Sequence, residues 1–295
     1  MKRIYLNLFI LILLVGFWTG CDDQMTGFDK AGGYYGEPSD LQSVTAESLP
    51  GQILLRWEVP ADSGYQLVKI SYYDYLTEKN VVEVASVYTD SLLVDNTRAR
   101  YGDYEFTLQP FNSNREGGNP VTITAQSGAA TVTTKITATK VTLTAGQLST
   151  NYQEPTEGPI ANLLDGNVST FFHTRWSSPQ SPMPHYIQID LNEPLQNFKF
   201  YYQNRNGSQV GAENLQVQIS NDGMIWETVA EITSGLPSAS KGEFTSEIFQ
   251  PGRTFTHFRY NVTKTYGSKN YFNMAEFALY DVLIEVYDPE VDEIE

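Results

Sequence analysis

The sequence is poor in the residues and motifs from which most catalytic sites are built. It has one cysteine and three histidines among 295 residues. A single cysteine cannot form a disulfide within the chain, and we expect no thiol chemistry inside the fold. Glycine-rich phosphate loops and the motifs Gly-x-Ser-x-Gly and His-Glu-x-x-His are also missing. A pair of glycosidase carboxylates stays open, because any two acids can meet in a folded chain.

Basic residues are scarce as well. The chain has 19 Lys and Arg against 35 Asp and Glu, a net charge of −16 at pH 7. Nucleic acids and anionic membrane surfaces both attract clustered Lys and Arg, so neither is expected as a partner. Part of the acidity lies in a tail over residues 284–295, which predicts a solvated end. Among the acids of this tail are Asp288, Glu290, Asp292, Glu293 and Glu295.

The apolar run near the N-terminus is too short to cross a membrane. Leu8–Trp18 falls well below the roughly 20 residues that a spanning helix needs. With Lys2 and Arg3 before it and small residues after it, the run predicts a signal peptide over residues 1–20. Cys21 follows as in a bacterial lipoprotein cleavage site, and this resemblance implies that Cys21 is acylated and anchors the chain. The alternative is an ordinary secretory peptide with an incidental cysteine.

The residues after the cysteine predict a localisation signal and a flexible tether. Asp22 and Asp23 resemble the acidic export signals of surface lipoproteins in the Bacteroidetes, with a plain linker as the alternative. We therefore expect an outer membrane lipoprotein at the cell surface, with the periplasmic face as the fallback, that touches the membrane only through its anchor. Residues 21–39 are rich in Gly and polar residues without a period, which predicts a flexible tether.

Residues 40–128 predict a β-sandwich. Apolar and polar residues alternate, for example at Ile53, Leu55 and Trp57, and turn residues interrupt this pattern about every ten positions. The stretch ILLRWEVP resembles the second strand of a fibronectin type III domain. GDYEFTLQPFN resembles the sixth strand, with Tyr104 near the tyrosine-corner position. The resemblance implies a spacer that lifts the next domain off the membrane, or a second binding surface.

The second half predicts another all-β domain, over residues 137–283, after an Ala- and Thr-rich hinge at 128–139. One or two helical turns are expected around Ile160–Leu164, before an Asp-Gly pair ends them. A parallel α/β sheet is not expected, since no long helical pattern separates the strands. Strands are predicted at Tyr186–Leu191, Phe198–Tyr202, Leu215–Ile219, Phe258–Val262 and Phe277–Tyr280.

Three stretches of this second domain together resemble a discoidin-type module, also called a coagulation-factor type C domain or, in bacteria, a galactose-binding-like carbohydrate-binding module. They are LLDGNVSTFFHTRW (163–176), ISNDGMIW (219–226) and HFRYNV…MAEFALY (257–280). The resemblance implies a jelly-roll sandwich with ligand loops at one end, and binding without catalysis. Because both domains resemble non-catalytic modules and no third domain is left to hold an active site, we expect no enzyme activity.

The same resemblance implies a calcium site. In the family, the turn after the helical segment wraps a calcium ion, and a glutamate near the last strand closes the site. Asp165, Asn167 and Thr170 match the turn, and Glu276 in MAEFALY matches the glutamate. Calcium prefers such oxygen ligands, so we expect a structural ion that ties distant parts of the domain together. The alternative is that Asp-Gly simply turns the chain and Glu276 is a rim charge.

The ligand site is expected among aromatic and planar polar residues of three loops. A saccharide presents hydroxyls and C–H faces, so its site needs an aromatic platform and a few polar groups. Galactose-type binders of the family use a His, an Arg, an Asn and an aromatic residue, and these types occur here. Each candidate could instead pack in the core or stabilise a turn. The candidates are Phe171, His173, Trp176, Arg205, Asn206, Tyr266 and Tyr271.

The sequence therefore predicts a glycan-binding lipoprotein that captures poly- or oligosaccharide, with proteins of a polysaccharide-uptake system as further partners. A protein–protein adhesion or scaffold role without glycan binding is the alternative, because both resembled folds also host that function. Phospholipid binding ranks last. Phe171 and Phe172 could be exposed apolar spikes, but few basic residues flank them.

Overall fold

The computed structural model describes residues 33–59, 64–207 and 210–292. The predicted signal peptide, the predicted acylation site Cys21 and most of the predicted tether lie outside the described residues. The regular secondary structure of the described chain consists of β-strands and a few short 3-10 helices, which confirms the all-β prediction. Among the described residues, no helix is long and apolar enough to cross a membrane.

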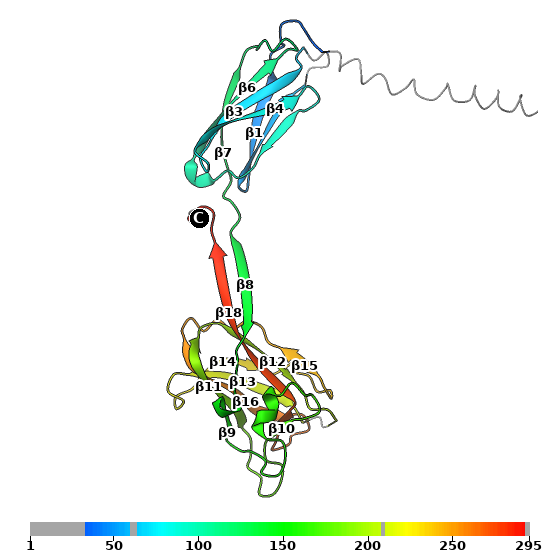
Figure 1. The fold of residues 1–295 in the computed structure, drawn as a ribbon, viewed down its shortest axis with the longest axis vertical. Coiled ribbons are helices and arrows are strands. Elements are labelled where there is room, and N and C mark those ends of the chain that lie inside the picture. The colour runs from blue at the N-terminus through cyan, green and yellow to red at the C-terminus, as the bar shows by residue number, and fades with distance from the viewer. Residues whose placement is uncertain (1–32, 60–63, 208–209, 293–295) are drawn as a thin grey trace, which may run out of the picture. The chain divides into compact units, whose positions relative to one another are not determined.

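The chain divides into two compact units (Figure 1). Of the described residues, those up to Thr133 and those from Tyr287 onward form the first unit, and those within Thr134–Val286 form the second. Each unit has its own hydrophobic core of buried side chains. The positions of the two units relative to one another are not determined, so each is described by itself.

The first unit is a sandwich of two antiparallel sheets, with strand orders β1-β2-β5 and β4-β3-β6-β7. Ile53 and Leu55 of β2 and Phe106 and Leu108 of β6 have no exposed surface. They occupy alternate positions because successive side chains of a strand point to opposite faces of the sheet. The strands are β1 (Gln42–Leu49), β2 (Gln52–Glu58), β3 (Leu67–Asp74), β4 (Lys79–Ser86), β5 (Ser91–Val94), β6 (Asp103–Phe111) and β7 (Val121–Gln126).

Tyr104 at the start of β6 closes the connection that leads into that strand. Its hydroxyl accepts a hydrogen bond from the backbone N–H of Arg98 at 2.8 Å and donates to the Arg98 carbonyl at 3.3 Å. A buried tyrosine that bonds the backbone a few residues upstream is the arrangement of a tyrosine corner. It satisfies the phenol inside the core and fixes the path of the chain between β5 and β6.

The second unit is a larger sandwich. Its two main sheets have the strand orders β14-β13-β16-β11-β9 and β15-β12-β18-β8, and a short pair β10-β17 lies beside them. A 3-10 helix, η5 (Ile160–Leu164), occupies the predicted helical segment. The strands are β8 (Thr133–Lys140), β9 (Leu148–Thr150), β10 (Phe172–His173), β11 (His185–Leu195), β12 (Phe198–Gln203), β13 (Ala212–Ser220), β14 (Glu227–Ile232), β15 (Glu243–Thr245), β16 (Phe255–Thr265), β17 (Asn273–Met274) and β18 (Glu276–Tyr287).

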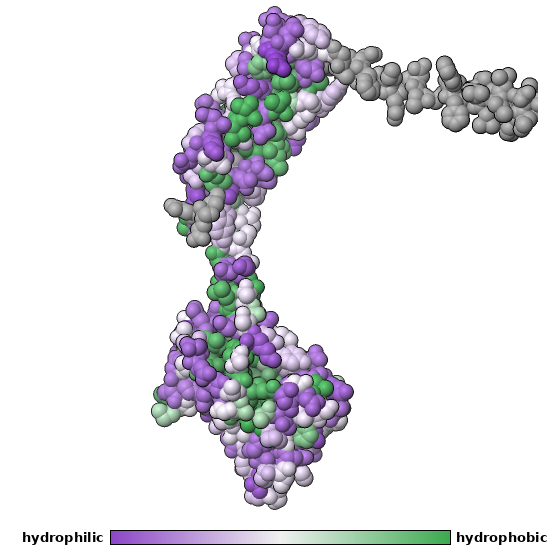
Figure 2. Space-filling model, viewed as in Figure 1, coloured by the Kyte–Doolittle hydropathy of each residue, from purple (hydrophilic) through white to green (hydrophobic). Residues whose placement is uncertain are grey.

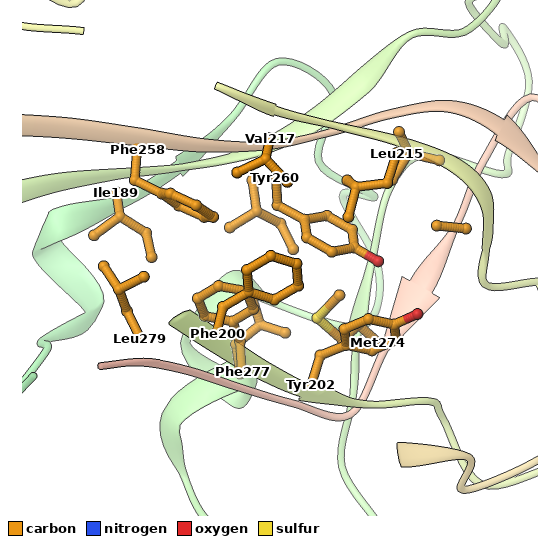
Figure 3. Packing of buried hydrophobic residues seen from close by; sticks show 14 of the residues in the cluster. Ile189, Phe200, Tyr202, Leu215, Val217, Phe258, Tyr260, Met274, Phe277 and Leu279 are labelled. Carbon is orange, nitrogen blue, oxygen red and sulfur yellow. The ribbon is translucent and has the colours of Figure 1, made fainter. Parts of the chain in front are cut away.

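Aromatic rings fill the space between the two sheets of this unit (Figure 3). Phe200 of β12 and Phe277 of β18 face Phe258 and Tyr260 of β16 across the core, with ring centroids 5.9 to 6.1 Å apart. All four are 2% exposed or less. Close-packed rings of this size make a rigid scaffold, and the loops at the ends of these strands inherit fixed positions from it.

Two segments differ from the sequence prediction. Residues 133–139, expected to be part of a hinge, belong to β8 (Thr133–Lys140), which is hydrogen-bonded to β18. All eight residues of β8 are exposed, so the apolar–polar alternation that marks a half-buried strand is missing. The run is rich in Thr with one Ile, and β-branched residues suit a strand. Figure 2 shows apolar surface along the two-stranded segment formed by β8 and β18. Ile136 of β8 and Leu283 of β18 are exposed.

The second difference is the acidic C-terminal segment. Residues 284–287, expected in a solvated tail, belong to β18. The carboxylate of Glu290 accepts backbone N–H groups of Ala99, Arg100 and Ala130 at 2.7 to 3.2 Å. These hydrogen bonds lower the pKa of Glu290, although burial acts in the opposite direction. An acidic composition therefore does not make this end a free tail, because one of its acids caps backbone donors of the first unit.

Candidate functional site

One end of the second unit gathers the loops that carry most of the predicted ligand residues. The pairing of β10 with β17 sets His173 opposite Asn273. It thereby joins the loop of residues 171–184 to the loop that precedes β17. The N–H of Ala275 donates to the carbonyl of the last residue of β12 at 2.8 Å, so Arg205, two residues further on, emerges at the same end.

Four predicted residues form a continuous series of contacts there. The guanidinium carbon of Arg205 lies 3.3 Å from the centroid of the Phe171 ring. The Phe171 and His173 rings are 6.2 Å apart, edge to face, and Tyr271 lies 5.3 Å beyond His173. A cation over an aromatic face is attracted by the ring quadrupole. The stack therefore fixes the guanidinium plane while its edge N–H groups stay available.

His173 is held in one orientation and is neutral. Only 3% of it is exposed, and burial lowers its pKa below the usual value. The Thr174 carbonyl partly offsets this effect, and the charge of Arg205 adds to it. Its Nδ1 lies 2.6 Å from the Thr174 carbonyl oxygen, which can only accept, so Nδ1 carries the proton. Nε2 is then an acceptor, and the Asn273 amide lies 3.5 Å from it.

Trp176 presents the exposed aromatic face of the cluster. It is 44% exposed, and its indole N–H donates to the Glu157 carboxylate at 2.8 Å. Glu157 also acts through its charge to raise the pKa of His173, which places it near both residues. Gly158 follows at φ +62, where a Cβ would come within 2.8 Å of His173. Only glycine lets this segment pack so closely.

Glu154 is buried and fixes the Trp176 loop through hydrogen bonds to the backbone of that loop. The residue is 2% exposed, and its carboxylate accepts the backbone N–H groups of Trp176 and Ser177, both at 3.1 Å. It also accepts the hydroxyls of Thr156 and Ser177. Burial acts to raise its pKa, but these hydrogen bonds outweigh burial and lower it to about 2. Glu154 is therefore ionised at neutral pH and fixes the path of the loop.

Sequence reasoning missed Glu154 and Glu157. Their stretch, Glu-Pro-Thr-Glu-Gly, signals a turn through its Pro and Gly, but nothing in it indicates the partners of the two acids. Both partners lie about 20 residues away, across the β10 segment.

Two predicted residues stand apart from the cluster. The hydroxyl of Tyr266 donates to the Leu236 carbonyl at 2.6 Å, so this ring braces a neighbouring loop. Asn206 is exposed, and no contact in the described part of the chain joins it to Phe171, His173 or Trp176.

The four predicted metal ligands lie together at the turn after η5. The Asp165 carboxylate accepts the Asn167 N–H at 2.8 Å and the Thr170 hydroxyl at 2.7 Å. The Asn167 carbonyl lies 2.7 Å from the same hydroxyl. Glu276, the first residue of β18, interacts with the Asp165 carboxyl. The turn and β18 thus bring two acids and two neutral oxygens to one place.

This group fits a hard cation. The Oε1 atom of Glu276 is buried and has no hydrogen-bond partner within the described residues. Burial, and then the charge of Asp165, raise the pKa of Glu276, while the Thr170 hydroxyl lowers that of Asp165. No group of three or more His, Cys, Asp or Glu that could hold a metal lies in the described part of the chain. Calcium also accepts carbonyls, hydroxyls and water, so two carboxylates do not exclude it.

Comparisons with known proteins identify a family match over more than half of the chain. Residues 119–277 match the model of the F5/8 type C domain. The chain is 25% identical over 178 residues to the A type blood N-acetyl-α-D-galactosamine deacetylase of Flavonifractor plautii, covering 58% of this chain and 20% of that protein. It is 28% identical over 144 residues to a sialidase of Micromonospora viridifaciens, covering 41% and 22% respectively.

The chain thus spans about a fifth of the length of these curated relatives. Among solved structures, it is similar to CpGH89CBM32-5 from Clostridium perfringens, in complex with GalNAc-β-1,3-galactose. The sequence identity is 21% and the TM-score 0.39, with 46% of this chain and 96% of that chain covered.

Proposed function

The chain belongs to the F5/8 type C domain family, and on this basis we propose that its second unit binds carbohydrate and does not catalyse. The observation that carries the proposal is the cluster at the loop end. A stacked arginine and a neutral histidine lie there in one series of contacts, and an exposed tryptophan is hydrogen-bonded to Glu157, whose charge acts on that histidine. The names of both curated relatives denote action on sugars, which supports a saccharide as the ligand class. The proposal concerns the second unit alone and does not extend to the activities of the relatives.

The side chains of this cluster divide the work of holding a sugar. Trp176 offers an exposed ring against which a C–H face packs. Arg205 makes no side-chain hydrogen bond within the described residues, so its planar N–H groups can donate to hydroxyls in a fixed direction. The Nε2 atom of His173 can accept one hydroxyl where the ligand displaces the long contact with Asn273. One platform and few polar groups predict weak binding, on the order of 0.1 to 1 mM.

Removal of either the platform or the donor is expected to weaken sugar binding without unfolding the unit. Trp176→Ala and Arg205→Ala should each cost at least about 1 kcal/mol of binding, roughly fivefold in Kd. The measurement is calorimetric titration of the full chain with a ligand found on a glycan array, beginning with galactose. Arg253→Ala is the matched control, because this exposed arginine pairs with Glu227 and should leave affinity unchanged.

Two results would count against this function. If neither variant changes the affinity for a confirmed glycan, the site lies elsewhere on the unit. If the wild-type chain binds no glycan on a broad array and instead captures a defined protein partner, the adhesion role replaces carbohydrate binding.

A calcium ion is part of the same proposal. Asp165, Glu276, Thr170 and the Asn167 carbonyl are the groups that would hold it. When bound, the ion would supply positive charge to two carboxylates that otherwise repel each other. Its role is structural. It would join the turn after η5 to β18, and Phe171 follows directly after this turn.

The first unit is proposed to be a fibronectin type III-like domain. Its three- and four-stranded sheets and the bonds between Tyr104 and the Arg98 backbone support this.

Lipid anchoring through Cys21, at the outer membrane, completes the proposal and has a simple test. Cys21→Ser is expected to move the protein from the membrane fraction to the soluble fraction, because the acylated thiol is the membrane contact we propose. Fractionation with an antibody against the second unit measures this. A serine variant that still sediments with membranes refutes the anchor.

A further inference from the structure

The outer face of the four-stranded sheet in the first unit is hollowed. A cavity of about 350 Å³ lies over β3, β4 and β6, at the lower end of the range for small-molecule sites. Ser71 of β3 pairs with Val82 of β4 on one side and Thr107 of β6 on the other. Cross-strand partners stand on the same face of a sheet, so the short Ser71 leaves room between taller neighbours.

Tyrosines form one wall of the hollow. Tyr73, the next outward residue of β3, is 40% exposed, and its ring lies 5.2 Å from that of Tyr75, edge to face. Tyr75 stacks on Tyr101 at 5.1 Å and meets the buried ring of Tyr104 edge-on at 5.1 Å. Its hydroxyl donates to the Asp103 carbonyl at 3.3 Å. Tyr73 is thus an exposed ring backed by a fixed aromatic cluster.

Three polar side chains of the hollow have no hydrogen-bond partner in the described part of the chain, whereas one oxygen of the Asp103 carboxylate accepts the Gln126 amide at 2.7 Å. The side chains of Tyr73, Asn80 and Glu105 make no hydrogen bond within the described residues. Asn80 is the cross-strand partner of Tyr73, and Glu105 precedes Thr107 by two residues on β6, which puts it on the same face. Asp103 also lines the hollow, and no Lys or Arg does. The hollow therefore favours groups that donate hydrogen bonds and disfavours carboxylates.

We propose that this hollow is a second binding site, for a short saccharide that is neutral or carries an amine. The ring of Tyr73 packs against a C–H face, as aromatic platforms do. The Asn80 amide and the carboxylates of Asp103 and Glu105 hold hydroxyl or ammonium groups. The first unit is then a ligand-binding module and not only a spacer. This proposal does not depend on the cluster at the loop end of the second unit.

The test uses the full chain with Trp176→Ala and Arg205→Ala combined, which silences the other proposed site. Three probes of equal length and different charge are titrated by calorimetry: cellotriose, triglucosamine and trigalacturonate. The first two are expected to bind with Kd on the order of 1 mM, and trigalacturonate at least about tenfold more weakly because of the two carboxylates. If the double variant and the wild type bind alike, the site in the second unit is in doubt, and the comparison of variants in the first unit still decides this proposal.

Substitutions in the hollow give the decisive comparison. Tyr73→Ala should weaken the binding of cellotriose and triglucosamine at least about fivefold, whereas Tyr35→Ala, at a more exposed tyrosine of the same unit, should leave it unchanged. Glu105→Gln should weaken triglucosamine binding and change cellotriose binding by less than about twofold, because only the ammonium loses a charge partner. Unchanged melting of the Tyr73 variant shows that the unit still folds.

Three outcomes overturn the proposal. The first is that neither cellotriose nor triglucosamine binds at concentrations up to about ten times the expected Kd. The second is that the folded Tyr73→Ala variant binds both as the parent chain does. The third is that trigalacturonate binds as tightly as cellotriose.

Discussion

Chelation of calcium is expected to lower the melting temperature of the second unit by roughly 5–10 °C. A ligand at 100 times its Kd stabilises a fold by about 2.7 kcal/mol, and 1 kcal/mol corresponds to about 2–4 °C in a domain of about 150 residues. Without a cation, the carboxyls of Asp165 and Glu276 face each other, and the buried Glu276 Oε1 lacks a partner. Scanning calorimetry of the full chain in calcium chloride and in EDTA measures the difference.

Two variants of β18 make this result specific. Glu276→Gln removes one carboxylate from the proposed site and should abolish the response to EDTA. Asp281→Asn removes an exposed acid from the same strand and should melt like the wild type, with the full response. Identical melting curves of the wild type in calcium and in EDTA would refute a calcium site of ordinary affinity.

Replacement of Glu154 by Gln is expected to destabilise the second unit by about 2 kcal/mol. It should also weaken sugar binding, although Glu154 itself is not expected to contact the sugar, because it positions the Trp176 loop. The drop of its pKa from 4.5 to about 2 corresponds to roughly 3 kcal/mol. About 2 kcal/mol is expected for Glu154→Gln because the amide oxygen of Gln still accepts part of the hydrogen bonds that lower this pKa. In Glu154→Gln, an NH₂ group replaces one of the two carboxylate oxygens. An NH₂ group cannot accept hydrogen bonds from the backbone N–H groups of Trp176 and Ser177. Chemical denaturation at pH 7 measures the stability, and calorimetric titration measures the affinity.

The pH dependence of the stability difference shows whether the charge of Glu154 causes the stabilisation. Because the folded-state pKa lies below the unfolded one, the stabilisation is fully present above about pH 4.5. It is lost as the pH falls toward 2. The stability gap between the wild type and Glu154→Gln should therefore be constant from pH 7 to 5 and shrink below pH 4.5. Glu193→Gln, at an exposed acid of the same unit, should show no gap at any pH, and a Glu154 gap that is independent of pH would contradict this account.

Much of the fold could be predicted locally. The alternation around Ile53, Leu55 and Trp57 marks a strand, because side chains of a strand point in turn to the core and to solvent, and all three residues are buried. The same signal marks Phe198–Tyr202, which forms most of β12. It fails for β8, which is exposed along its whole length. Pairing with β18 makes that segment a strand, and a pairing partner about 140 residues away leaves no trace in the local pattern.

The candidate site shows the same division. Residue types and motif order pointed to Phe171, His173, Arg205 and Tyr271, and the structure brings these four into contact. The same reasoning gave equal standing to Tyr266, whose hydroxyl instead braces the carbonyl of Leu236. A residue type indicates what a side chain can do, and its neighbours decide whether that capacity is still free.

The sequence by itself determined the all-β class, the two-part organisation and the family, because these depend on periodicity and on short motifs that are read within local windows of the chain. Only the tertiary structure decided that Glu154 lies beneath the Trp176 loop, that Glu276 meets Asp165, and that Ser71 and Tyr73 border a hollow. Each of these depends on which strands pair and in which register. Strand pairing and register are set by the burial of whole sheet faces, so no single segment of the chain contains the information.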